Sequence, residues 1–335
     1  MKIFHFGCWD LFGCHADYVT NSIINDIIFK NDYDFGFISG DNIYNYYGII
    51  SKKKTNYSIK KMTNAIECIN RLNIPAFIAL GNHDIDDDNC AMIELQMETP
   101  TLYPKVHHGW NMINNYYTVI SNNNIFIVID TNILDIKLLK NNTKAVDTTF
   151  KCYKKIKHND KKDLTQLILE DYNEMYRMID DIDLDQYNNV IMIGHIPILS
   201  VKEKSKGDIV NCISNNTNLF TELFDLFISK NIKKLYYVCA DTHNFQHMVF
   251  KYKNLQIEQI ISGTGGALLD TIKKCDIASL PSVIDDLYSF KLLDFNPNFG
   301  YTMMDIKRNN INIEFISFNY DMNQEYLIKI EQSFD

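Results

Sequence analysis

Four short segments of the chain carry side chains that bind metal ions, and each segment directly follows an apolar run. They read Gly40-Asp41-Asn42-Ile43-Tyr44, Gly81-Asn82-His83-Asp84, Gly194-His195-Ile196-Pro197 and Ala240-Asp241-Thr242-His243. A carboxylate bridges two cations through its two oxygens, imidazole and amide oxygen are neutral ligands, and a phenolate binds ferric iron well. Asp241 and His243 are two residues apart, so in an extended segment both point to the same side. These residue types predict metal-assisted chemistry.

Each segment alone has an ordinary structural explanation. An aspartate after a strand often caps the next helix, and a single histidine such as His195 often makes only a structural hydrogen bond. Four such segments in this order, each at the end of an apolar run, favour one shared metal site over four unrelated loops.

The elements that must position these segments alternate between short apolar runs and helix-length stretches. We expect strands at Ile3–Phe6, Phe35–Ser39, Ala76–Leu80, Tyr116–Ile120, Ile125–Asp130, Val190–Ile193, Leu235–Cys239, His247–Tyr252, Ile257–Ser262, Tyr301–Ile306 and Ile311–Phe318. We expect helices at Ala16–Phe29, Tyr57–Arg71, Leu164–Ile182 and Leu219–Ile228. Ligands of α/β sheets bind at the carboxyl ends of the strands, so the polar loops should converge there. The pattern predicts a single α/β domain over residues 1–335, with a polar insertion at about 135–162.

Composition excludes several classes of partner. The net charge of −9 is spread along the chain without a basic block, so an extended nucleic-acid surface is disfavoured. No run approaches the length of a membrane span, and no signal-peptide pattern precedes the first strand. The 8 cysteines form no C-x-x-C pair, so we expect reduced, mostly buried thiols and an intracellular protein. The oligomeric state stays open.

The order of the four segments, with His243-Asn244-Phe245-Gln246-His247 at the end of the series, resembles the calcineurin-like metallophosphoesterase superfamily. The tyrosine at position 44 makes the chain similar to the short, tartrate-resistant type of purple acid phosphatase, and the likeness extends from Phe4 to about Phe318. The resemblance implies a four-layer α/β/β/α sandwich, in which helices flank two mixed β-sheets and the metals lie at one edge.

The resemblance also implies a ligand set for two divalent or trivalent ions of zinc, iron or manganese. The first ion would be held by Cys8, Asp41, Tyr44 and His243. The second would share Asp41 and add Asn82, His195 and Asp241. His83 would lie near the phosphate and act as a hydrogen-bond donor or acid.

The chain departs from the family pattern at three positions. Cys8 in Gly7-Cys8-Trp9-Asp10 and Asp241 stand where the family has aspartate and histidine, and Lys204 stands where the short phosphatases have a substrate-side histidine. Thiolate and carboxylate are both ligands of zinc and iron, and a lysine is still a cation that could face phosphate. Two alternatives stay open: Asp10 rather than Cys8 reaches the first metal, or metal binding has decayed.

The implied function is hydrolysis of phosphomonoesters by a hydroxide that the two metals activate, with a phosphorylated small molecule or a phosphoprotein as substrate. His83 or Lys204 would assist the charge on the phosphoryl group or protonate the leaving group. The loops Pro104–Asn115 and Ile198–Ile213 would then set specificity. The alternative is a catalytically silent relative that serves as a binding or structural protein.

Overall fold

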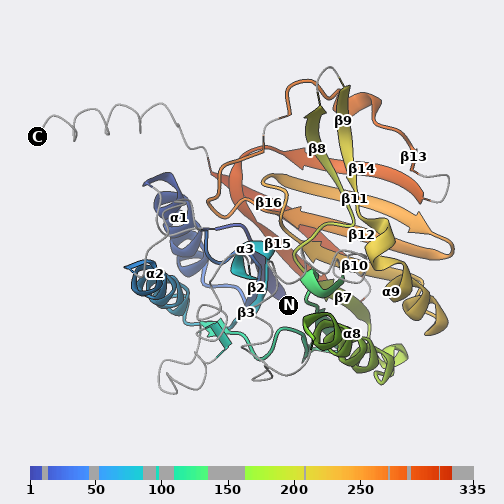
Figure 1. Ribbon diagram of the computed structural model, residues 1–335, viewed down its shortest axis with the longest axis horizontal. Helices are drawn as coiled ribbons and strands as arrows, with labels where there is room; N and C mark the ends of the chain where they lie inside the picture. Colours follow the sequence, from blue (N-terminus) through green and yellow to red (C-terminus); the bar gives the residue numbers. More distant parts are fainter. Residues whose placement is uncertain are drawn as a thin grey trace, which may run out of the picture.

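In the computed structural model of the chain, the described residues are 1–9, 14–44, 53–85, 96–97, 109–134, 163–206, 209–270, 272–284, 288–308 and 310–318. Within them, two large mixed sheets face each other and helices cover their outer sides (Figure 1). The expected polar insertion at about 135–162 and the alternative ligand Asp10 lie outside the described residues.

The first sheet has the strand order β16-β15-β1-β2-β3-β4. Its strands are β1 (Lys2–Phe6), β2 (Phe35–Ser39), β3 (Ala76–Ala79), β4 (Trp110–Asn111), β15 (Phe299–Lys307) and β16 (Asn310–Phe318). Strand β1 pairs in parallel with β2 and antiparallel with β15. The sheet is therefore mixed, as expected.

The second sheet has the order β13-β14-β11-β12-β10-β7-β6-β5. Its strands are β5 (Tyr117–Ser121), β6 (Asn124–Val128), β7 (Asn189–Ile193), β10 (Lys234–Cys239), β11 (Phe245–Tyr252), β12 (Leu255–Ser262), β13 (Val283–Ile284) and β14 (Tyr288–Asn296). Strands β6, β7, β10 and β12 run in parallel, whereas β11 pairs antiparallel with β12 and β14.

The central strands of both sheets are buried on both faces, which explains their nearly continuous apolar sequences. In β2, Phe35 and Phe37 point toward the second sheet, where both rings contact Phe126 of β6. The next residue, Ile38, belongs instead to the core on the helix side. Helices α1 (Cys14–Lys30) and α2 (Lys53–Asn70) accompany the first sheet, and α8 (Leu164–Asp180) and α9 (Thr217–Ser229) accompany the second (Figure 1). The predicted fold class, mixed sheets flanked by helices, is confirmed.

Two glycines allow the loops after β2 and β3 to touch. Gly40 has a φ of +81°, and a Cβ there would lie 2.4 Å from the amide nitrogen of Gly81. A Cβ on Gly81 would in turn lie 2.3 Å from Oδ1 of Asp41. Side chains at these positions would push the two loops apart, so the glycines set the close approach on which the site depends.

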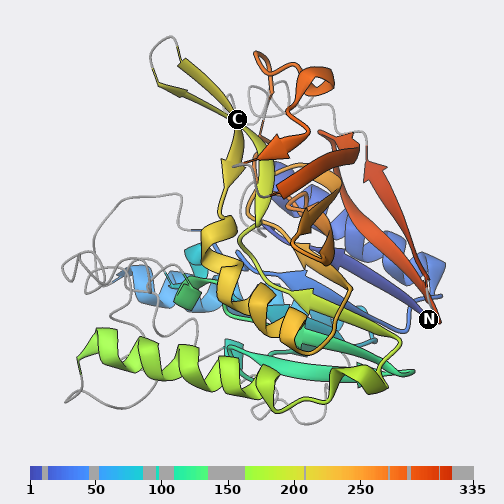
Figure 2. The same ribbon diagram turned by 90° about the vertical axis from the view of Figure 1, so that its right-hand side faces the viewer.

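Strands β8 (Leu199–Lys206) and β9 (Ile209–Asn215) form a separate two-stranded hairpin that projects from the second sheet (Figure 2). The segment Ile198–Ile213, expected to be a loop, therefore contains two strands instead. Its first half is tied to the second sheet by the buried amides of Gln246 and Gln259, which bond the backbone of Val201 and Leu199. Strand β9 has another attachment, a disulfide between Cys212 and Cys275.

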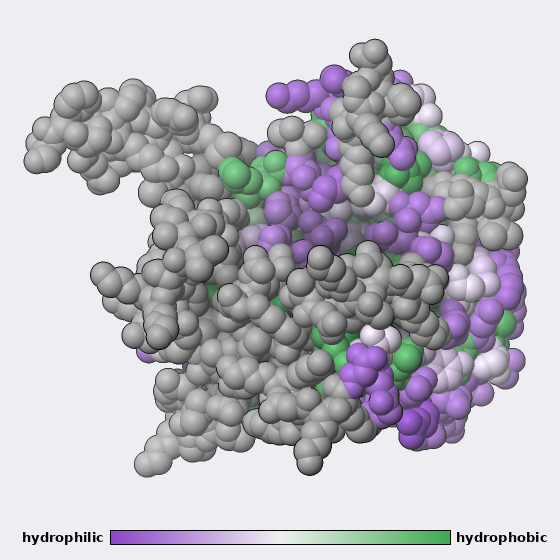
Figure 3. Space-filling model, in the orientation of Figure 1, coloured by the Kyte–Doolittle hydropathy of each residue, from purple (hydrophilic) through white to green (hydrophobic). Residues whose placement is uncertain are grey.

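The disulfide corrects the expectation that all the cysteines are reduced thiols. Cys8, Cys68 and Cys239 are buried thiols outside any disulfide, as that expectation requires, but Cys212 and Cys275 are linked. On the surface, hydrophilic residues gather in a band across the middle of the face seen in Figure 3. Among the described helices, none combines the length and apolarity needed to cross a bilayer.

Candidate metal centre

The predicted ligands lie on loops that follow the carboxyl ends of five strands. Cys8 follows β1, Asp41 follows β2, and His195 follows β7. Asn82 begins the short helix α3 (Asn82–Ile85) after β3, and Asp241 and His243 follow β10. Cys8, Asp41 and Asp241 have φ values of 52°, 54° and 57°, so each loop turns sharply as it leaves its strand. Aspartate adopts this left-handed conformation more readily than most residues, which makes Cys8 the unusual member.

A first group of donor atoms gathers between Cys8, Asp41 and His243. One ligand atom from each of these residues lies within 4.8 Å of the other two. The Sγ of Cys8 is 3.9 Å from Oδ2 of Asp41. The hydroxyl of Tyr44 donates to the same oxygen at 2.8 Å and lies 3.2 Å from Nε2 of His243. The structure thus brings together the four residues predicted to hold the first ion.

A second group of donor atoms surrounds Nε2 of His195. This nitrogen lies 3.0 Å from Oδ1 of Asn82, 3.3 Å from Oδ1 of Asp41 and 3.9 Å from Oδ1 of Asp241. The two carboxylate oxygens of Asp41 therefore face different groups, Oδ1 the second and Oδ2 the first. This is the arrangement that a bridging carboxylate requires.

Backbone carbonyls orient both imidazoles toward the donor groups. The Nδ1 atoms of His195 and His243 each lie 2.6 Å from a carbonyl oxygen, that of Ser39 and that of Leu268. A carbonyl only accepts, so each Nδ1 carries a proton and donates it. Nε2 of each ring then faces the other predicted ligands, as a metal-binding histidine requires.

Protons balance the negative charge of the centre. Burial works to raise the pKa of Asp41, but the adjacent His195 outweighs it and holds this pKa well below its usual range. Burial works to lower the pKa of His195, but Asp41 and then Asp241 raise it to about 9. Burial, followed by Asp41 and Asp241, raises the pKa of the Cys8 thiol well above its usual value. A cation bound here would have to displace such protons, as ligand deprotonation at metal sites generally does.

Asp84 joins two of the ligand loops, a role that the sequence analysis did not assign to it. Its carboxylate accepts from the amides of Gly81 at 2.8 Å and Asn42 at 3.0 Å, and from the side chain of Asn42 at 3.1 Å. Burial, followed by repulsion from Asp41, raises the pKa of Asp84 to about 7. The sequence signal that could have identified this role is the position of Asp84 in the segment Gly81-Asn82-His83-Asp84.

His83 lies beside the centre through its backbone as well as its ring. Its amide donates to Oδ1 of Asp41 at 3.0 Å, and its ring centroid is 4.6 Å from that of Tyr44. The imidazole is partly exposed. This position leaves it free to meet a bound ligand.

Lys202 is a cation at the rim that the sequence analysis missed. Its Nζ lies 3.1 Å from Oδ2 of Asp270, the oxygen that accepts the amide of His243 at 2.9 Å. Burial works to lower the pKa of Lys202, but Asp241, Asp270 and Cys8 raise it. The side chain of the predicted Lys204 lies outside the described part of the structure; its backbone pairs with Asn211 in the β8–β9 hairpin. The register shifts between Val201 and Lys204, so counting residues from His195 does not place either lysine.

The residues present fit metal ions in their donor chemistry. The first group offers thiol, carboxylate, imidazole and phenol, and the second offers carboxylate, imidazole and amide oxygen. All are ligand types of zinc, iron or manganese, and most of them are shielded from water. The metal-binding role of the individual residues stays a prediction.

Comparison with known proteins supports the fold independently. Residues 1–245 match the calcineurin-like phosphoesterase family. GAP50, the anchor in the inner membrane complex of Plasmodium, superposes with a TM-score of 0.54 at 16% identity over 95% of this chain and 84% of its own. The purple acid phosphatase PPD1 from yellow lupin (Lupinus luteus) seeds gives 0.54 at 14% identity, over 96% of this chain and 52% of its own. PhoD gives 0.51 at 11% identity, over 94% of this chain and 68% of its own.

No curated protein sequence matches the chain significantly. The similarities to solved structures are too low in identity to show more than the fold. The family match covers most of the chain and includes all the predicted metal ligands. The family is metal-dependent and acts on phosphoesters. The chain is therefore a member of the calcineurin-like phosphoesterase family, as the order of its motifs predicts.

Proposed function

We propose that the chain is a metal-dependent hydrolase of phosphomonoesters with a binuclear centre. The observation that carries this proposal is the position of Asp41, whose two oxygens face two separate groups of donors. Its substrate would be a phosphorylated small molecule or a phosphoprotein.

Each group of donors would hold one ion. Cys8, Asp41, Tyr44 and His243 would hold the first, and Asp41, Asn82, His195 and Asp241 the second. When bound, the ions would supply Lewis acidity that activates water and neutralises phosphoryl charge. Burial of Cys8 and Asp41 keeps the centre in a low dielectric, which strengthens its electrostatic interactions.

Lys202 and His83 would act on the substrate from outside the ligand set. Lys202 is held at the rim by Asp270 and carries a raised pKa, so it is charged at neutral pH and suited to a phosphoryl oxygen. His83 is partly exposed next to Tyr44, where it would donate a hydrogen bond or a proton to the leaving oxygen. Lys204 stays a candidate for the role proposed for Lys202.

A catalytically silent member of the family is the second candidate function. GAP50 shares the fold and is described as an anchor, and this chain carries Cys8 and Asp241 at two positions where the family pattern has other ligands. A silent protein would bind fewer than two ions and hydrolyse nothing, so metal content separates the two candidates.

Hydrolysis of 4-nitrophenyl phosphate by the full chain tests the proposed function. Turnover should require added zinc, iron or manganese and should stop when a chelator removes the metal. Lys202→Met should raise KM for the phosphomonoester about 10- to 100-fold while changing metal content little, because loss of one charge-assisted hydrogen bond costs about 1.5–3 kcal/mol. Hydrolysis that persists in the chelated protein would contradict the proposal.

A further inference from the structure

A segment after β12 holds one of the predicted metal ligands in place. We call residues 268–275 the tether; residue 271 lies outside the described part of the structure. The carbonyl of Leu268 accepts from Nδ1 of His243 at 2.6 Å, and Oδ2 of Asp270 accepts the amide of His243 at 2.9 Å. The amide of Asp270 donates to the carbonyl of His243 at 2.9 Å. Both the backbone and the ring of His243 therefore depend on the tether.

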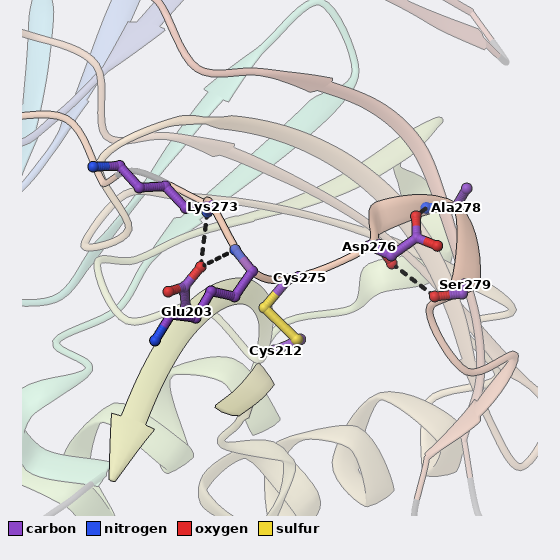
Figure 4. The surroundings of a disulfide bond; sticks show 8 residues. Glu203, Cys212, Lys273, Cys275, Asp276, Ala278 and Ser279 are labelled. Atoms are coloured by element: carbon purple, nitrogen blue, oxygen red, sulfur yellow. Dashed lines mark hydrogen bonds between the residues drawn. A yellow bond between two sulfur atoms is a disulfide. The ribbon is translucent and has the colours of Figure 1, made fainter. Parts of the chain in front are cut away.

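The other side of the tether is fastened to the β8–β9 hairpin. Lys202 pairs with Asp270, and Oε2 of Glu203 accepts the amides of Lys273 and Lys274 at 2.8 Å each. The disulfide between Cys212 and Cys275 closes the same contact covalently (Figure 4). The carboxylate of Glu203 and the disulfide thus hold three consecutive residues of the tether, Lys273, Lys274 and Cys275.

The disulfide is the strongest of these attachments. The noncovalent attachments are weaker, because Lys202, Asp270 and Glu203 are partly exposed, Lys273 and Lys274 are exposed, and solvent screens such contacts. The base of the hairpin is fixed independently, because Gln246 bonds the amide and carbonyl of Val201 at 2.8 Å. The hairpin is therefore a firm anchor, and the disulfide connects the tether to it.

We propose that the disulfide between Cys212 and Cys275 is a redox-sensitive lock on the metal centre, acting through Asp270 and His243. This inference rests on the proposed function of the site. A dithiol reductant would open the lock by thiol–disulfide exchange: its thiolate attacks one sulfur, the S–S bond breaks, and the second thiol of the reductant releases the remaining cysteine. The products are two cysteine thiols and the oxidised reductant. Cys212 and Cys275 are both partly exposed, which gives such a reductant access.

Opening the lock leaves the tether held by noncovalent contacts alone, namely its bonds to His243, the partly exposed ion pair of Lys202 with Asp270, and the exposed bonds of Glu203. The constraint on the backbone of His243 and on its Nδ1 partner is then weaker, so its Nε2 is less firmly aligned with Cys8 and Asp41. Partners that orient a metal ligand typically change metal affinity by about 10–100-fold when they are lost. The disulfide would therefore change the metal affinity of the first group of donors although neither of its sulfurs is a ligand.

The affinity of the full chain for Zn²⁺ alone, measured by competition with a chromogenic chelator, tests the lock. A phosphine reductant is used, because a dithiol would itself bind zinc. We expect the reduced protein and the double variant Cys212→Ser/Cys275→Ser to bind zinc about 10-fold more weakly than the oxidised protein. The double variant should not respond to the reductant. Cys68→Ser, which replaces a buried thiol of α2 that is not part of the disulfide, should behave as the unmodified chain.

Hydrogen exchange separates failure of the lock from failure of the proposed function. In the protein without metal, reduction should speed exchange of the amides of His243, Lys273 and Lys274 at least 10-fold, while amides in β10 keep their protection. Equal zinc affinity in both redox states, or unchanged exchange at these three amides, would overturn the lock. Absence of zinc binding in every state, with faster exchange after reduction, would overturn the proposed function and leave the lock intact as a structural device.

Discussion

Oδ1 of Asp41 lies 3.3 Å from Nε2 of His195, and both side chains are buried. The other oxygen of the same carboxylate accepts the hydroxyl of Tyr44 at 2.8 Å and faces Cys8 and His243. One residue thus couples the two groups of donors. Loss of its charge should affect both groups together rather than one of them.

Asp41→Asn should therefore remove both metals at once and abolish phosphatase activity. The amide keeps the size of the side chain but loses the charge that balances His195 and the bound cations. Metal per chain by mass spectrometry is the measurement, with a thermal melt to verify folding. Asp180→Asn, which changes an exposed carboxylate paired with Lys230 outside the metal centre, is the matched control and should keep full occupancy. Full occupancy in Asp41→Asn would show that Asp41 does not bridge.

The metal-loaded protein should be colourless, because the thiolate of Cys8 suits zinc at the first group of donors. Ferric iron bound to Tyr44 would instead give a visible charge-transfer band. The absorption spectrum of the purified protein and of Tyr44→Phe distinguishes the two metals. A purple preparation that Tyr44→Phe bleaches would refute the preference for zinc, while supporting Tyr44 as a ligand.

Replacing Cys8 and Asp241 with the residues of the family pattern tests whether these two predicted ligands are working replacements. Cys8→Asp suits the backbone φ of 52° but adds a carboxylate beside Asp41 and Asp241, so we expect a lower Tm without metal and a larger rise when zinc is added. Asp241→His should strengthen zinc binding at the second group about 10-fold, since a neutral imidazole adds no negative charge. Thermal melts with and without zinc measure both effects. Metal binding gained only by the double variant would indicate decay instead.

Acid stability should depend on Glu258, which lies outside the metal centre. Burial works to raise its pKa, but His247 at 2.9 Å and Lys234 at 2.7 Å lower it below the usual 4.5. Because the pKa of Glu258 is lower in the folded chain than in the unfolded chain, its ionised carboxylate stabilises the fold above pH 4.5. This contribution is lost as the pH falls through the pKa of the folded state. Glu258→Gln should cost about 1 kcal/mol of unfolding free energy at pH 7 and less below pH 4.

Urea unfolding across this pH range is the measurement for Glu258→Gln. Asp225→Asn, at an ion pair with Lys253 that is about half exposed on both sides, is the control and should change stability little at any pH. An equal loss of stability from Glu258→Gln at pH 7 and pH 3 would contradict the electrostatic explanation.

Much of the fold was predictable because the central strands of both sheets are buried on both faces. The run Phe35–Ser39 was predicted with the bounds that β2 has, since its apolar residues pack against the other sheet or the helices. Strand β8 was not, because Lys202, Glu203 and Lys204 interrupt any apolar pattern. Its hairpin depends on buried glutamines and a disulfide, which leave no periodic signal in the sequence.

The candidate site was predictable to the extent that its residues follow strands. Cys8 and Asp41 follow neighbouring parallel strands of the first sheet, and His195 follows β7 of the second sheet and meets Asp41 between them; the motif order was sufficient to group the three residues. The bond between Asp270 and His243 joins segments that only the folded chain brings together. The pairing of Cys212 with Cys275 was likewise not predictable, because 8 cysteines permit many pairings and their spacing selects none of them.

Metal stoichiometry combined with turnover tests the central claim most directly. The full chain should be purified, freed of metal, reloaded with zinc, iron or manganese, and measured for ions per chain and for hydrolysis of a small aryl phosphate. We predict more than one ion per chain in the active form, at least one in the protein as purified, and weak but measurable turnover that Asp41→Asn abolishes. A protein with no metal and no turnover, rescued only by Cys8→Asp together with Asp241→His, would contradict the active account and establish the silent one.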